Sequence, residues 1–129
     1  MEEENKGVSL SESQLALMRI LWQRPESSVS DVVEAMREQR SLAHTTVATM
    51  LSRLEKRGLV RTRKEGRQFL YSATVSKSDI QKSMVSDLLS SLFLGNARAL
   101  LSYLVQEDEI KQEDLDHIRA LLKDHHQSK

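Results

Sequence analysis

The chain has 129 residues, enough for one compact domain with a helical extension. It contains no cysteine, which excludes disulfides, thiolate metal sites and cysteine catalysis, and its formal net charge of zero indicates no partner by itself. Only 4% of the residues are aromatic against 39% hydrophobic, so the core must be mainly aliphatic, which suits helices.

The chain opens with MEEENKG, which is acidic and lacks the hydrophobic run of a signal peptide. No apolar stretch approaches the roughly 20 residues that cross a bilayer, so we expect a cytoplasmic protein with no membrane insertion. Residues 1–8 are expected to form a disordered leader. Ser11 followed by Gln14 is a capping-box pattern that predicts a first helix over residues 13–23.

Two further helices are predicted between the first helix and Gly58. Residues 24–28 read as a turn, and Ser30 is a suitable N-cap for a second helix over residues 31–40. A third helix is predicted over residues 44–57, with Gly58 in the C′ position that commonly ends a helix.

The pattern changes to β-structure after the third helix. Two short runs of strand-forming residues, 59–64 and 68–74, flank a glycine-bearing turn and predict a hairpin. Phe69, Tyr71 and Ala73 share one face of it by period two. A short third strand near Val29 sometimes joins such a hairpin.

The rest of the chain is predicted to be helical. Ser76 or Ser78 can cap a helix that is interrupted at residues 95–96, and two shorter helices follow over 97–106 and 112–125. Three helices followed by a hairpin are the plan of a winged helix-turn-helix. The fold class is therefore mainly α with a small β-hairpin. We expect a winged-helix DNA-binding domain over residues 9–75, a helical dimerisation region over 76–124 and a flexible tail over 125–129.

The third helix has the character of a recognition helix. Its outer face is small and polar at the N-terminal half and basic towards the C-terminal half. Short Thr and Ala side chains allow close approach to base edges in the major groove. The base-contact candidates are Thr45, Thr46, Ala48 and Thr49. The other interpretation is an ordinary solvated face with a capping role.

Basic residues gather on the end of this helix and on the hairpin. Residues 40–67 carry eight basic side chains against two acidic ones, a net charge of +6. Such a segment favours an anion-binding face. The phosphate-contact candidates are Ser52, Arg53, Lys56, Arg61, Arg63, Lys64 and Arg67. The hairpin charges alone are also compatible with an edge strand that resists aggregation.

The stretch TTVATMLSRLEKRGLVRTRKEGRQFLYSA resembles the signature of the penicillinase-repressor family, the BlaI/MecI/CopY type of bacterial winged-helix regulators. It has the T-V-x-T-x-L-x-R-L run, a basic strand, G-R and an aromatic-bearing strand. LSESQLALMRILW is similar to the family's first helix, and the resemblance covers roughly residues 9–124. It implies a homodimeric transcriptional repressor that binds a dyad operator and controls resistance or stress genes. By position, the four base-contact candidates would face the bases, with Arg53 near the backbone and Arg67 on the wing.

The chain departs from the family pattern at several positions. Staphylococcal members have long basic side chains at the positions of Thr45 and Ala48, which are small here, so the same operator is not assumed. Proteolytic induction through a membrane sensor metalloprotease would cut at a pair that aligns with Ser102 and Tyr103, where the family has asparagine before an aromatic residue. The copper-responsive route needs cysteines and is absent.

The C-terminal helices call for a partner because about 50 residues form too small a core alone. We expect a homodimer, matching the two half-sites of a dyad operator. The dimer-interface candidates are Ile80, Met84, Leu88, Leu92, Leu100, Leu104, Ile118 and Leu122.

Two other functions stay open: a winged helix that binds proteins without DNA, and a ligand-sensing regulator of the MarR type. The four histidines have no metalloprotease, nucleophile-elbow or P-loop context. We therefore expect no enzyme activity, no cofactor and no metal site.

Overall fold

The computed structural model describes residues 9–127, so the leader expected over residues 1–8 and the last two residues lie outside it. The chain forms two compact units that divide between Met84 and Val85. The first unit therefore takes in the first two turns of a helix that sequence analysis assigned to the second region. The reason is Ile80, which is 3% exposed and belongs to the core of the first unit.

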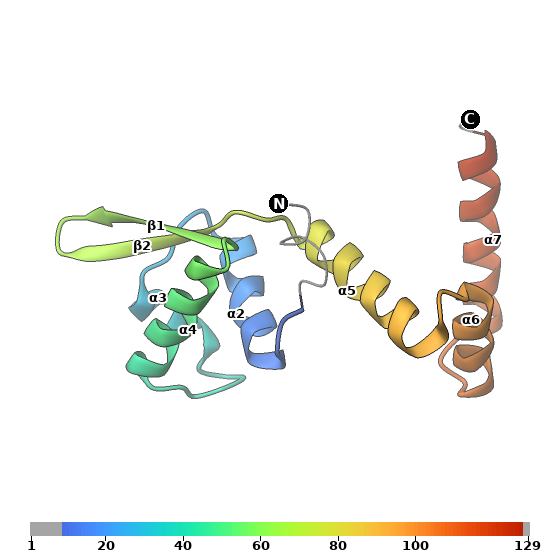
Figure 1. Cartoon of the computed structure of the whole chain (residues 1–129), viewed down its shortest axis with the longest axis horizontal. Coiled ribbons are helices and arrows are strands. Elements are labelled where there is room, and N and C mark those ends of the chain that lie inside the picture. The colour runs from blue at the N-terminus through green and yellow to red at the C-terminus, as the bar shows by residue number, and fades with distance from the viewer. Residues whose placement is uncertain (1–8, 128–129) are drawn as a thin grey trace. The chain divides into compact units, whose positions relative to one another are not determined.

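The first unit is a winged helix (Figure 1). Its elements are α2 (Glu12–Gln23), α3 (Val29–Met36), α4 (His44–Lys56), β1 (Val60–Glu65), β2 (Gln68–Ala73) and the start of α5 (Lys77–Phe93). The fold class predicted from the sequence is thereby confirmed. The hairpin extends beyond the helices, which pack at its base.

The core of the first unit is aliphatic, as the composition requires. The fully buried side chains of α2, α3 and α4 are Leu17, Met18, Val32, Met36, Val47, Leu51 and Leu54. Each contributes about 1.5–3 kcal/mol by leaving water. This core holds α4 by one face and leaves its other face to solvent.

The first helix begins at the predicted capping box. The backbone N–H of Gln14 donates to Ser11 Oγ at 3.1 Å, and the Gln14 side chain accepts from the Ser11 N–H at 3.0 Å. The predicted N-cap of the second helix, Ser30, is wrong. Ser28 caps α3, because its hydroxyl accepts from the Asp31 N–H while the Asp31 carboxylate accepts from the Ser28 N–H.

The second helix is also shorter than predicted. It ends at Met36, and residues 37–39 form a turn instead of continuing to residue 40. The Arg40 N–H still donates to the Met36 carbonyl, at 2.7 Å, and its guanidinium pairs with Glu12 of α2. The chain thereby turns back towards α2 before α4 begins.

The hairpin pairs β1 with β2 in antiparallel register, with Val60 opposite Ala73 and Glu65 opposite Gln68. Gly66 has a φ of +64° in its turn, a value that glycine adopts without strain. The expected third strand is a single bridge between Ser27 and Tyr71, whose backbone groups exchange hydrogen bonds of 2.9 and 2.8 Å.

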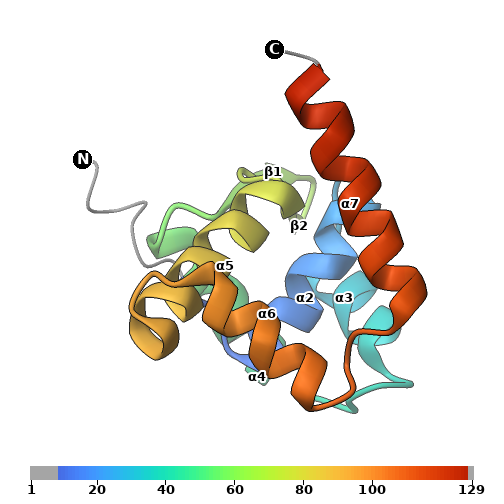
Figure 2. The same ribbon diagram turned by 90° about the vertical axis from the view of Figure 1, so that its right-hand side faces the viewer.

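The second unit holds the end of α5 with α6 (Ala97–Gln106) and α7 (Gln112–Gln127). Asn96 caps α6 by accepting from the Ala99 N–H at 3.0 Å. Figure 2 shows α6 and α7 as two arms joined by the turn at residues 107–111. The last helix continues to Gln127, past the start of the predicted tail.

No single helix within residues 9–127 is long and apolar enough to cross a membrane, and α5 with α6 meet the length and composition criteria only as a bent pair.

Candidate nucleic-acid interface

The outer face of α4 is open to solvent along its length. Its inner side chains Val47, Leu51 and Leu54 are 0% exposed. On the outer face, Thr45, Thr46 and Thr49 are exposed and Ala48 is half-buried. The predicted base-contact candidates therefore share one accessible surface of a rigid helix, as major-groove contact requires.

The three threonines of α4 do not cap it. The N-cap is Ala43, which makes no side-chain cap hydrogen bond. Within the described residues, the hydroxyls of Thr45, Thr46 and Thr49 have no hydrogen-bond partner. A capping role therefore does not explain them, and their hydroxyls are available to an incoming ligand.

The C-terminal end of α4 is held by its glycine. Gly58 has a φ of +81°, its N–H donates to the Glu55 carbonyl, and the Leu59 N–H donates to the Leu54 carbonyl at 3.0 Å. This pair of bonds is the Schellman motif. It ends α4 and starts β1 within a few residues, so the basic end of the helix stays close to the base of the wing.

Basic side chains flank the outer face of α4 at this end. Arg53 and Lys56 are exposed, and neither forms an ion pair with any residue that the structure describes. Arg57 points elsewhere, because its guanidinium donates to the Ser9 carbonyl at 3.0 Å. Ser52 is exposed on the same outer face as the threonines.

The wing carries a second group of basic side chains. Lys64 and Arg67 are exposed at its outer end, next to the turn at Gly66. The Lys64 ammonium lies 6.0 Å from the ring centroid of its cross-strand neighbour Phe69, which is 49% exposed. Phe69 was not among the predicted site residues, although period two placed it on one face of the hairpin.

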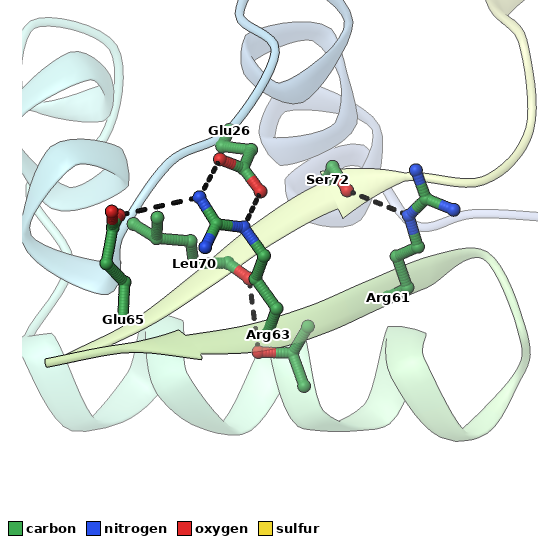
Figure 3. Close-up of polar contacts among 7 residues, drawn as sticks. Glu26, Arg61, Arg63, Glu65, Leu70 and Ser72 are labelled. Atoms are coloured by element: carbon green, nitrogen blue, oxygen red, sulfur yellow. Dashed lines mark hydrogen bonds and ion pairs between the residues drawn. The ribbon is translucent and has the colours of Figure 1, made fainter. Parts of the chain in front are cut away.

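Arg63 differs from the other basic residues of the wing because it is already paired (Figure 3). Its Nε and Nη2 donate to the two carboxylate oxygens of Glu26, at 2.5 and 2.7 Å, and Nη2 also lies 3.5 Å from Glu65. The hydrogen bond from Arg63 holds the pKa of Glu26 below its ordinary value. The same pairing raises the pKa of Arg63.

Arg61 lies on the same face of β1 and makes one weak contact, from Nε to Ser72 Oγ at 3.4 Å (Figure 3). The phosphate-contact candidates therefore fall into two groups. Arg53, Lys56, Arg61, Lys64 and Arg67 form no ion pair with a carboxylate of the described residues, whereas Arg63 has two such partners. Glu26 gave no signal in the sequence because its partner lies 37 residues away.

The dimer-interface candidates occupy different environments. Ile80 lies in the core of the first unit and Met84 packs against that core. Leu88, Leu92 and Leu122 are 42%, 69% and 55% exposed. The remaining candidates, Leu100, Leu104 and Ile118, are half-buried within the second unit.

The pair predicted as a possible induction cleavage site lies inside α6. Ser102 and Tyr103 are both exposed, and the Tyr103 ring lies 6.2 Å from that of Phe93. Cleavage between them requires α6 to unwind locally. No three His, Cys, Asp or Glu side chains within the described residues come together in a way that could hold a metal ion.

Three helices, a basic wing and an open recognition helix define a winged helix-turn-helix protein of the DNA-binding type. The family follows from the sequence match. The model of the penicillinase repressor family matches residues 10–124, and the chain belongs to that family. The resemblance seen in the sequence is confirmed, and because the family consists of transcriptional repressors, the protein is not an enzyme.

Two relatives match most of the chain at low sequence identity. The methicillin resistance regulatory protein MecI of Staphylococcus aureus strain N315 is 24% identical over 119 residues, which cover 92% of this chain and 97% of the relative. The penicillinase repressor of Staphylococcus aureus is 22% identical over 120 residues, covering 93% and 95%.

The solution structure of the DNA-binding domain of the repressor BlaI is similar to the winged helix. It is 30% identical with a TM-score of 0.51, and the alignment covers 57% of this chain and 90% of that domain.

Proposed function

We propose that the protein is a sequence-specific DNA-binding transcriptional repressor that binds a dyad operator as a homodimer and controls a resistance or stress operon in the cytoplasm. The observation that carries this proposal is the outer face of α4, where three threonine hydroxyls without partners in the described structure precede two unpaired basic side chains. The same fold serves as the DNA-binding domain of BlaI.

The length and charge of each side chain indicate whether it contacts bases or phosphates. Thr45, Thr46, Ala48 and Thr49 are short and exposed or half-buried, so they suit contacts with base edges and thymine methyl groups. Lys56 on α4 and Arg67 on the wing are long, exposed and positively charged, so they suit contacts with the phosphates that flank those bases.

The homodimer is supported by the second unit. None of its described side chains is buried, and Leu92, Leu94, Leu121 and Leu122 are between 54% and 91% exposed. Large apolar side chains that are left exposed in this way support an interaction surface on the second unit. A second copy covers it with the symmetry that a dyad operator requires. A membrane sensor metalloprotease remains the candidate inducing partner.

The test is fluorescence-anisotropy binding to the DNA upstream of the protein's own gene, against a scrambled duplex of equal length. Measurements at about 50 and 200 mM salt separate phosphate contacts from other binding, because each contact releases counterions. We expect tight, salt-sensitive binding that prefers the promoter duplex. A complete lack of binding at low salt would overturn the proposal and leave the protein-binding winged helix.

The oligomeric state needs its own measurement. Sedimentation equilibrium should give twice the chain mass of 14.8 kDa, and replacing Leu92 and Leu122 by serine should lower the dimer affinity. A matched control is the pair of exposed polar residues Ser90 and Arg119, whose replacement by alanine should leave the dimer intact. A monomer at high concentration would refute the dimer.

A further inference from the structure

The contact between Glu26 and Arg63 joins two parts of the winged helix that are distant in sequence. Glu26 lies in the turn between α2 and α3, and Arg63 lies in the middle of β1, on the far side of β2. The Arg63 side chain therefore extends across β2, and its guanidinium meets the Glu26 carboxylate beside the turn (Figure 3). Two parallel hydrogen bonds to a carboxylate fix the direction of a guanidinium as well as its distance.

The neighbouring residue strengthens the same connection. Ser27, next to Glu26, exchanges two backbone hydrogen bonds with Tyr71 of β2. The turn between α2 and α3 is thus bonded to both strands of the wing, to β2 through the backbone and to β1 through the ion pair. Ser28 then caps α3, which packs against α4. The wing and the recognition helix are connected through this turn.

The pairing also changes what Arg63 can offer to DNA. Of its guanidinium nitrogens, Nε and Nη2 are engaged with carboxylates, and a second acidic residue, Glu65, stands on the same strand face. Two carboxylates beside one guanidinium oppose the approach of a phosphate. Lys64, its neighbour on the other strand face, has no such partner among the described residues.

We propose that Glu26 and Arg63 are positioning residues of the DNA-binding surface, which set the angle of the wing relative to α4, and that Arg63 does not contact phosphate. This inference rests on the proposed DNA-binding function. The Glu26 side chain is 33% exposed and the Arg63 side chain is 53% exposed, so the ion pair adds little to the free energy of unfolding. Its main effect is to orient the wing.

A double-mutant cycle tests the proposal. The variants are E26Q, R63Q and the double variant, with K64Q as the matched control for a phosphate contact on the same strand. The readouts are the ratio of affinities for promoter and scrambled duplexes and the slope of affinity against salt. Circular dichroism at the assay temperature verifies that each variant is folded.

We expect E26Q and R63Q each to lower the affinity ratio by about two- to fivefold, the scale of an exposed ion pair. The double variant should lose no more than either single variant, because both remove the same contact. The salt slope should stay unchanged in R63Q, whereas K64Q should reduce it by about one unit.

Two outcomes overturn the inference: losses that multiply in the double variant, or a salt slope in R63Q that falls as it does in K64Q. Failure of the proposed function itself is recognised separately, because the unmodified protein would then show no preference for the promoter duplex.

Discussion

The indole N–H of Trp22 donates a hydrogen bond of 2.8 Å to the backbone carbonyl of Val75, which lies 53 residues later in the chain. Trp22 stands near the end of α2, and Val75 lies in the segment between β2 and α5. The bond therefore connects the first helix of the winged helix to the point where the chain leaves the wing. Both residues also pack against the core of the first unit.

Replacing Trp22 by phenylalanine should lower the free energy of unfolding by about 1–3 kcal/mol, because the Val75 carbonyl loses its donor and the smaller ring packs less well. Urea denaturation followed by circular dichroism measures the change. The control is Gln23→Ala, an exposed position on the same helix, which should shift stability by less than about 0.5 kcal/mol. Equal effects of the two substitutions would contradict the role of the indole bond.

Local signals in the sequence predicted most of the fold. The Ser11–Gln14 capping box, the Gly58 helix end and the hairpin turn at Gly66 each depend on residues within a few positions of one another. The open face of α4 was predicted for the same reason, since helical periodicity alone separates it from the core. The bonds from Trp22 to Val75 and from Arg63 to Glu26 could not be predicted, because they depend on how distant segments pack.

The error at the second helix had a local cause. Ser28 and Ser30 both precede Val32, Val33 and Met36 of α3, but only Ser28 has an acidic residue three positions later. Asp31 completes the reciprocal pair of hydrogen bonds, and Ser30 has Val33 in the equivalent place. The third position after each serine was the signal that distinguishes them.

The cap assignment predicts a difference between the two serines. Ser28→Ala should lower the free energy of unfolding by about 1 kcal/mol, because the Asp31 N–H loses its acceptor. Ser30→Ala should change it by less than about 0.5 kcal/mol, since Ser30 is exposed within the first turn of α3. Urea denaturation of both variants measures the contrast, and a larger loss for Ser30→Ala would restore the original assignment.

The two kinds of DNA contact predict different losses. Thr49→Ala should weaken binding to the cognate site by about 1–3 kcal/mol and leave binding to random DNA almost unchanged, because a base contact acts only on the right sequence. Lys56→Gln should weaken both alike and reduce the salt slope by about one unit. Anisotropy titrations with both duplexes at several salt concentrations compare them. Equal losses of Thr49→Ala on both duplexes would refute base readout by this residue.

The Glu26–Arg63 pair makes a prediction about pH. The hydrogen bond from Arg63 is the main cause that lowers the pKa of Glu26 from its ordinary value of 4.5, and partial desolvation opposes it. A carboxylate with a depressed pKa in the folded state contributes stability above its ordinary pKa, and the contribution is lost as the pH falls through the folded value. The pair is therefore intact throughout the neutral range and breaks only in acid below pH 4.5.

Carbon-detected NMR titration of the Glu26 carboxyl should give a midpoint below 4.5 in the unmodified protein. In R63Q the midpoint should move back towards the ordinary value, because the charged donor is gone. If the Glu26 midpoint were the same in both proteins, the bidentate pair would be absent in solution, and the wing would have to be oriented by the Ser27–Tyr71 bridge alone.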